Sequence, residues 1–444
     1  MKRAKILFSV LIFTICFSFF STCFGVTLEE RTSKLEDGIT SEAVLIMENS
    51  TGKIVYEKNG YDQRYPASTT KILTAILTIE HCNLSETTTA SEYAIRSIPS
   101  GYSTANIQIG ETLSIKDLLY ALMLQSANEA AVILAEHVSG SMEAFCDLMN
   151  EKAKEIGCKN THFVNPNGVH SKEHYSTAYD LALIAQYAMK NPTFREIVKT
   201  TSYTLPATTA YPSDTRTFTN TNALIIYDNR DRLDNYYYEY ATGIKTGYTS
   251  YAKNCLVSSA EKNGMEYFCV VLGAEVQYAY TGTYSARYVD TISLFDYAFD
   301  NFSFRKLKSG NSNVKTVQID NATKDTKNLD LITHDDITAL VSIDSKDSPF
   351  EPNISLKDGL KAPISKGDVV GQISYDIEGI KYTSDLLAGS DVKEFKSSKI
   401  LLNVVIFIGL FAAVVFGIRC YNLRKRHLKN RYKYVQTYGF SKKK

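Results

Sequence analysis

The stretch Pro66–Ala75 constrains this chain more than any other part, because it sets a serine and a lysine side by side where a helix starts. Proline suits the first helical turn, where its missing N–H costs nothing, and an apolar run follows from Ile72 to Ile79. Ser68 and Lys71 are three residues apart, so they share one helix face. The stretch therefore predicts a serine nucleophile with a basic partner beside it.

A serine hydroxyl is a poor nucleophile until a base removes its proton. Lys71 can be that base only if its pKa falls far below the usual value of about 10.4. Burial, neighbouring cations and the positive end of a helix all lower it. The Ser-x-x-Lys spacing arises by chance about once or twice in a chain of this length, with a solvated lysine as the plain alternative. Its meaning depends on the motifs that follow.

Two further motifs follow in order along the chain. Ser126-x-Asn128 lies at a break between two apolar helical runs, and Lys245-Thr246-Gly247 lies on a strand-like run. Each alone has an ordinary explanation, a helix cap for the first and a strand end for the second. Together, and in this order, the three motifs match the Ser-x-x-Lys, Ser-x-Asn and Lys-Thr-Gly set of penicillin-binding proteins and serine β-lactamases.

The residue types in these motifs suit acyl transfer. Ser68 would attack a carbonyl carbon while Lys71 takes its proton. Ser126 would relay that proton to the leaving amine, and Asn128 would hold Lys71 and the substrate amide. Lys245 adds positive charge, which helps to keep Lys71 neutral and attracts an anionic substrate.

The strand carrying the third motif is the expected substrate platform. Gly247 lets a substrate lie close against the strand edge. The backbone N–H groups of Ser68 and Tyr248 would form the oxyanion hole, worth about 2.7–4 kcal/mol per donor in a comparable site.

Beyond these motifs the chain resembles the serine D-Ala-D-Ala carboxypeptidases, the low-molecular-mass penicillin-binding proteins, over residues 40 to 390. The resemblance implies removal of the terminal D-alanine from peptidoglycan stem pentapeptides through an acyl-enzyme on Ser68, with β-lactam antibiotics as covalent inhibitors and without a cofactor or metal. The segments that carry it are Ser126–Ala131, Met149–Ala153, Gly157, Thr161–Phe163, Asn165–Gly168, Ser176–Leu181, Gly243–Thr249, Ala362–Ile364, Lys366-Gly367 and Gly371.

The same resemblance implies that Thr246 and a nearby arginine bind the terminal carboxylate of the substrate. Arg287 is the arginine that we expect there, and a structural surface arginine is the alternative reading of it. Lys253 stands where the family often has glycine after Ala252.

The pattern of elements predicts an α+β fold of the penicillin-binding and β-lactamase type, with an antiparallel sheet flanked by helices. We expect a catalytic domain at 26–303 and a small β-rich domain at 304–394. The expected strands are Glu42–Met47, Lys53–Glu57, Gly243–Tyr248, Asn254–Ser259 and Tyr267–Gly273, and the expected helices begin with the Ser68 helix and continue with Leu113–Gln125, Glu129–Val138, Met142–Ile156, Thr177–Met189 and Tyr288–Phe299.

Both ends of the chain carry membrane signals. Residues 1–25 read as a signal peptide, with a basic start, an apolar run and small residues before the cleavage site; a retained anchor is the alternative. Residues 399–418 read as a transmembrane helix, and a helix lying on the membrane surface is the alternative. The tail at 419–444 holds ten lysine or arginine residues and no acidic residue. It predicts a single-pass protein with a cytoplasmic tail and an extracellular catalytic domain.

The cysteines predict neither a metal site nor a disulfide framework. The exported part holds an odd number, in no metal-binding spacing. They look like small buried side chains, with pairing of Cys255 and Cys269 left open.

Three other functions fit the sequence less well than a carboxypeptidase does. A membrane-anchored β-lactamase needs a deacylating glutamate in a Glu-x-x-Leu-Asn setting, and the sequence holds none. A non-catalytic cell-wall-binding protein would leave the coincidence of the three motifs unexplained. The basic tail could bind nucleic acid, but its position beside a membrane span favours lipid contact or topology control.

Overall fold

The computed structural model describes residues 27–227, 235–279, 282–345, 347–396 and 399–438, so the predicted signal peptide lies outside the described residues. The chain divides into two compact units. The first holds the chain up to Arg305 together with Thr338–Pro349 and Ile377–Ile380, and the second holds the rest.

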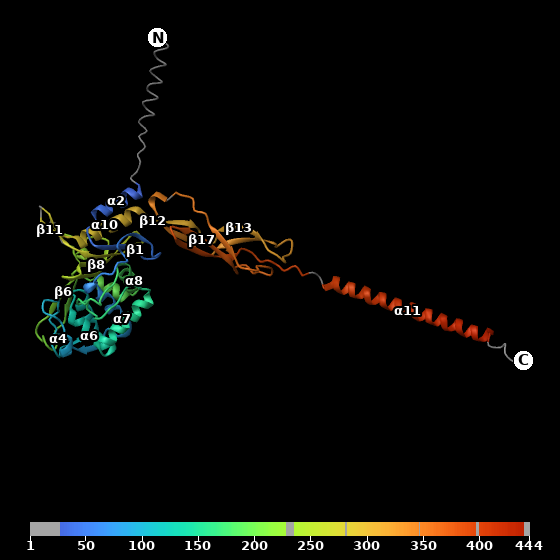
Figure 1. Ribbon diagram of the computed structural model, residues 1–444, viewed down its shortest axis with the longest axis horizontal. Helices are drawn as coiled ribbons and strands as arrows, with labels where there is room; N and C mark the ends of the chain where they lie inside the picture. The colour runs from blue at the N-terminus through green and yellow to red at the C-terminus, as the bar shows by residue number, and fades with distance from the viewer. Residues whose placement is uncertain (1–26, 228–234, 280–281, 346, 397–398, 439–444) are drawn as a thin grey trace, which may run out of the picture. The chain divides into compact units, whose positions relative to one another are not determined.

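A five-stranded sheet forms the centre of the first unit (Figure 1). Its order is β2-β1-β9-β8-β7, with antiparallel pairing throughout, so β7 lies at an edge. Two strands joined by a tight turn start it, as predicted. The bounds are β1 Ala43–Glu48, β2 Ile54–Lys58, β7 Ala241–Thr249, β8 Lys253–Lys262 and β9 Met265–Ala274.

Alternating residues of β1 supply both hydrophobic cores. Ala43, Leu45 and Met47 face one core, whereas Val44 and Ile46 face the other. Because side chains alternate along a strand, the sheet buries both of its faces. An antiparallel sheet covered by helices on both faces confirms the predicted α+β fold. The first core is closed by α3 Lys71–His81, α5 Ile115–Met123, α6 Asn128–Ser139, α7 Met142–Ile156, α8 Ala178–Ala188 and α9 Pro192–Lys199, and the second by α10 Ala286–Asn301 and α2 Leu28–Gly38.

Two of these helices were missed in the sequence, although both carry start signals. Thr27 and Glu30 form a capping box at α2. Asn191 caps α9, and Pro192 occupies its first turn. α2 contains few apolar residues and α9 spans only eight residues, so neither forms a long apolar run in the sequence.

One predicted helix begins too early. Leu113 and Ser114 belong to a strand, and Ser114 caps α5, which ends at Met123 rather than Gln125. The first unit also holds several short elements: β3 Thr87–Thr89 paired with β4 Thr112–Ser114, α4 Glu92–Arg96, β5 Ser202–Leu205 paired with β6 Arg216–Thr219, η2 Ala223–Ile225, and β10 Val276–Ala279 paired with β11 Gly282–Ser285.

The second unit is rich in strands, as predicted. Its five-stranded sheet has the order β13-β14-β18-β17-β16. Burial alternates along β18, where Tyr382, Leu386 and Ala388 are covered while their neighbours are less so. The bounds are β13 Asn313–Gln318, β14 Asn328–Thr333, β16 Asn353–Leu356, β17 Val369–Ile377 and β18 Ile380–Ala388. A separate pair, formed by β12 Phe302–Lys308 and β15 Ile337–Ser342, consists mostly of residues of the first unit, as does η3 Ile343–Ser345.

The C-terminal helix α11 runs over Lys399–Tyr438 without a break. The predicted span at 399–418 forms its first half, and the helix continues into the basic tail, which contains neither proline nor a helix-ending glycine before Tyr438. Among the described residues it is the one helix long and apolar enough to cross a membrane.

Cys255 and Cys269 are both free. They belong to different cores on opposite faces of the central sheet. The pairing left open by the sequence is therefore not present.

Candidate active site

Ser68 lies in a tight 3-10 turn, η1 Ala67–Thr70, and α3 begins only at Lys71. This corrects the prediction that both residues lie on one α-helix. The turn follows Pro66 and contains Ala67 with a φ of +48°, an uncommon value for a residue with a side chain. The serine is thereby held at the start of a buried helix.

Two glycines pack closely against this turn. A Cβ on Gly168 would overlap the carbonyl oxygen of Ala67, and Gly168 has a φ of +82°. A Cβ on Gly247 would lie 3.1 Å from both Pro66 O and Ser68 N. Because neither glycine has a side chain, the segment Asn165–Gly168 and the edge strand β7 can both approach Ser68 closely.

Lys71 is completely buried, and its amine reaches three acceptors. Nζ donates to Ser68 Oγ at 3.0 Å, to Asn128 Oδ1 at 2.8 Å and to the carbonyl oxygen of Asn167 at 2.5 Å. The first two motifs thus meet within hydrogen-bonding distance.

The electrostatics of the site favour a neutral Lys71. Burial lowers the pKa of Lys71 well below its ordinary value, and the charge of Lys245 lowers it further, against an opposing effect from Glu129. Lys245 is itself buried, and burial together with Arg287 lowers its pKa to about 7. Its Nζ has no hydrogen-bond partner among the described residues.

A polar cavity of about 430 Å³ opens over these groups. It brings together seven of the nine predicted site residues, whereas Lys71 and Lys245 are buried. Its lining consists of Ser68, Ser126, Asn128, Thr246, Gly247, Tyr248 and Arg287, together with Gly101, Tyr102, Ser103, Thr221, Thr249 and Ser250.

Arg287 stands near the first turn of α10 and lines this cavity. Its Nη1 donates to the carbonyl oxygen of Gly247 at 3.4 Å, and its guanidinium lies 4.7 Å from the ring centre of Tyr288. Arg287 therefore lies at the cavity, and its carboxylate-binding role stays a prediction.

Sequence reasoning gave no role to three residues that the structure places at the site. Asn167 offers a carbonyl to Lys71, Ser103 offers a carbonyl to Asn128, and Thr221 shares a 2.6 Å hydrogen bond with Thr246. Two of the three act through backbone carbonyls, which every residue type carries, so their side chains give no signal. In the sequence, Asn167 is only part of the segment Asn165–Gly168, which is typical of the family.

Comparison with known proteins agrees with the class that this fold and cleft define, a penicillin-binding serine hydrolase. Residues 30–276 match the family described as D-alanyl-D-alanine carboxypeptidase. Residues 302–394 match the family described as the C-terminal domain of penicillin-binding protein 5. The chain belongs to the D-alanyl-D-alanine carboxypeptidase family.

Individual relatives extend over most of the chain. The D-alanyl-D-alanine carboxypeptidase DacF of Bacillus subtilis is 32% identical over 400 residues, which cover 89% of this chain and 95% of that protein. The crystal structure of penicillin-binding protein 5 from Haemophilus influenzae is 27% identical, covers 80% of this chain and 98% of its own, and superposes with a TM-score of 0.62. The crystal structure of PBP3 from Streptococcus pneumoniae is 26% identical, and the match covers 80% of this chain and 100% of that chain with a TM-score of 0.64.

Proposed function

We propose that this serine D-Ala-D-Ala carboxypeptidase works through an acyl-enzyme on Ser68, with Lys71 as the base. The observation that carries the proposal is the 3.0 Å contact between Lys71 Nζ and Ser68 Oγ, made by an amine that is buried and close to a second lysine. An amine in this setting loses its proton readily, which a general base requires.

A neutral Lys71 amine can satisfy all three of its contacts with its own donors and acceptor. A neutral amine has two N–H groups, which match the two fixed acceptors Asn128 Oδ1 and Asn167 O. Its lone pair is left for the Ser68 hydroxyl. The three contacts of Lys71 Nζ therefore also fit a neutral amine, which donates to Asn128 and Asn167 and accepts the proton of the Ser68 hydroxyl.

In the reaction, Ser68 Oγ bonds to the carbonyl carbon of the penultimate D-alanine, and the bond from that carbon to the terminal amine breaks. The serine proton passes to Lys71 and then, through Ser126, to the leaving amine. Ser126 lines the same cavity as Ser68 and is held with a φ of +61°. Water then hydrolyses the ester and frees the serine.

The edge of β7 supplies the binding groups. The substrate would lie along Gly247, with its carboxylate near Thr246 and Arg287 and its carbonyl oxygen at the N–H groups of Ser68 and Tyr248. The free edge of β7 and the close approach of Gly247 to Ser68 N support this placement. Lys245, a buried residue of β7, would add positive charge for the carboxylate.

A membrane-anchored β-lactamase would place a deacylating carboxylate in the cleft. No residue that lines the cavity in the described part of the chain is Asp or Glu. The nearest carboxylate along the chain, Glu129, is turned to backbone N–H groups of the cleft wall.

Penicillin exposure tests this function. We expect the full-length protein in detergent to form one slowly hydrolysed penicillin adduct, which peptide mapping by mass spectrometry places on Ser68. The same preparation should release D-alanine from a peptide ending in D-Ala-D-Ala. Rapid hydrolysis of penicillin without a lasting adduct would identify a β-lactamase instead, and an adduct on another residue would contradict the mechanism.

We extend the proposal to the placement of the chain. The exposed, apolar start of α11 would anchor the protein in the cell membrane, with the basic end of the helix inside and the domains at 26–303 and 304–394 outside. The cleaved signal at 1–25 would export them. A tag added after Lys444 should resist external protease in intact cells. Digestion of the tag would show that the C-terminal end lies outside the cell, which contradicts the proposed orientation.

A further inference from the structure

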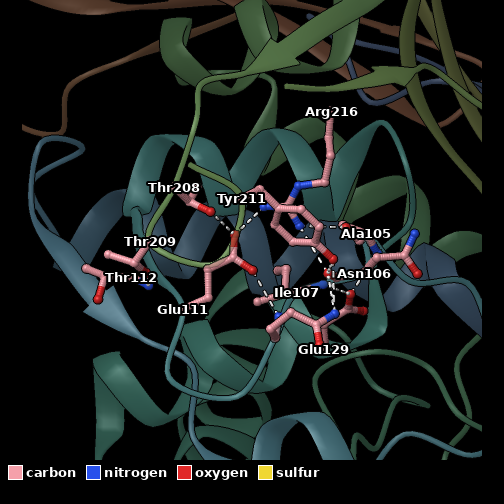
Figure 2. A network of polar contacts seen from close by, with 11 residues as sticks. Ala105, Asn106, Ile107, Glu111, Thr112, Glu129, Thr208, Thr209, Tyr211 and Arg216 are labelled. Atoms are coloured by element: carbon pink, nitrogen blue, oxygen red, sulfur yellow. Dashed lines mark hydrogen bonds and ion pairs between the residues drawn. The ribbon is translucent and has the colours of Figure 1, made fainter. Parts of the chain in front are cut away.

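Residues Ser103–Ile107, here called the wall segment, are held on one side by a buried carboxylate (Figure 2). Glu129 follows Asn128 in the first turn of α6 and is 2% exposed. Its Oε1 accepts hydrogen bonds from Ala105 N at 2.7 Å and from Ile107 N at 3.4 Å. The carboxylate thus takes up backbone donors of a segment that has no strand partner to satisfy them.

An arginine holds the wall segment through its carbonyl groups. Arg216, the first residue of β6, donates from Nη1 to Ala105 O at 2.9 Å and to Asn106 O at 3.2 Å. Tyr211 donates its hydroxyl to Asn106 O at 2.9 Å and lies under the guanidinium at 4.3 Å. Figure 2 shows these groups meeting around the wall segment.

The arginine is fixed in turn by a second buried carboxylate. Arg216 Nη2 donates to Oε1 of Glu111, which is 1% exposed. The same oxygen accepts from Thr208 Oγ1 at 2.6 Å, and Oε2 accepts from Gln108 N at 2.9 Å. A guanidinium that bridges a carboxylate and two carbonyls has little freedom to rotate.

The wall segment also touches the catalytic groups. The carbonyl oxygen of Ser103 accepts from Asn128 N at 3.0 Å and from Asn128 Nδ2 at 2.9 Å. Because Nδ2 is engaged there, Oδ1 faces Lys71 Nζ at 2.8 Å. A displaced Ser103 carbonyl would free the amide to rotate and present its N–H₂ group to the lysine.

We propose that Arg216 and Glu129 are positioning residues for acylation, which hold the wall segment so that Ser103 fixes the Asn128 amide with its oxygen toward Lys71. The inference rests on the proposed function. It adds two residues that lie outside the three motifs and that act through backbone groups.

Glu129 also has an electrostatic effect that separates it from Arg216. The groups that face Lys71 are Lys245 on β7, Glu129 on α6 and His174 before α8. Burial lowers the pKa of His174 to about 3, so that imidazole stays neutral. The Glu129 carboxylate favours the charged form of Lys71, and removing its charge should lower the pKa of Lys71 further.

The test compares acylation of full-length variants by a fluorescent penicillin, with the rate constant and the affinity measured separately over a range of pH. For Arg216→Gln we expect acylation to slow about 10–100-fold with little change in affinity, as misplacement of a catalytic group does. Glu129→Gln should also slow acylation. In addition, the pH at which the acylation rate falls on the acidic side, which reports the protonation of Lys71, should move lower in Glu129→Gln. In Arg216→Gln this pH should stay unchanged.

Arg195→Gln is the matched control. Arg195 makes a two-point ion pair with Glu266, at 2.8 and 2.7 Å, and does not line the cavity. It should lose stability but keep the wild-type acylation rate. Equal slowing of the Arg195 and Arg216 variants, or wild-type acylation by Arg216→Gln, would overturn the proposal.

Tyr211→Phe covers the case in which Arg216→Gln does not fold. It removes a hydroxyl that donates to Asn106 O at 2.9 Å and accepts from Gln108 Nε2 at 3.1 Å, and it leaves the buried charges paired. We expect a slower acylation rate at unchanged affinity, and an unchanged rate would count against the proposal. A wild-type protein that forms no adduct on Ser68 would instead reject the proposed function itself.

Discussion

Ser68→Ala should abolish both D-alanine release and penicillin labelling while leaving the fold intact. The change removes one oxygen at a turn whose backbone is fixed by Gly168 and Gly247, so little rearrangement is expected. Without the nucleophile no acyl-enzyme can form, and loss of such a group costs on the order of 10⁴-fold or more in turnover. The measurements are D-alanine release, adduct mass and the melting temperature of the full-length protein.

Thr69→Ser is the control within the same turn. Thr69 donates its hydroxyl to Pro66 O at 2.7 Å, and serine can keep that hydrogen bond. The variant should label like the wild type, because its hydroxyl does not face Lys71. Residual labelling of Ser68→Ala would show that a different hydroxyl is acylated, and loss of labelling in Thr69→Ser would show that any small change in the turn blocks the reaction.

The meeting of the motifs could be anticipated from sequence because each motif falls at the start or the edge of an element. Lys71 begins α3, Asn128 begins α6, and Lys245 lies on the edge strand. Polar residues at such positions interrupt otherwise apolar runs, and the interruption is visible in the sequence. The sheet and most helices followed from the same contrast between apolar runs and turn residues.

What the sequence did not reveal depends on backbone geometry. The 3-10 turn at Ser68 and the positive φ of Ala67 arise from packing against Gly168 and β7, which are far away in the chain. Lys253 has a φ of +57°, the left-handed conformation that suits the glycine common in the family. Its long side chain is accommodated at the surface, where Nζ reaches Glu42 and Glu275.

The second lysine of the cleft links catalysis to stability. Lys245 is buried, and its pKa in the folded protein is about 7 against an ordinary value of 10.5. Between these two values the unfolded chain binds a proton that the folded chain does not. Stability therefore rises with pH across this window, and below it the folded protein bears the cost of a buried charge.

Lys245→Met should consequently stabilise the protein and impair it as an enzyme. Methionine fills a similar space and leaves no hydrogen-bond partner behind, since Nζ has none among the described residues. At pH 6 we expect a gain on the order of 1–4 kcal/mol, seen as a melting temperature several degrees higher. The gain should shrink as the pH rises above about 7.

The pH profile of kcat/KM for D-alanine release supplies the second readout. In the wild type kcat/KM should fall above about pH 7, where Lys245 loses the charge that attracts the substrate carboxylate. Lys245→Met should lack this fall and lose on the order of 10²–10³-fold at neutral pH. Its acidic limb should move to higher pH, because Lys71 no longer has a cation beside it. Lys245→Arg, which stays charged, should keep the acidic limb at low pH. An acidic limb that does not move in Lys245→Met would show that Lys245 does not set the pKa of Lys71.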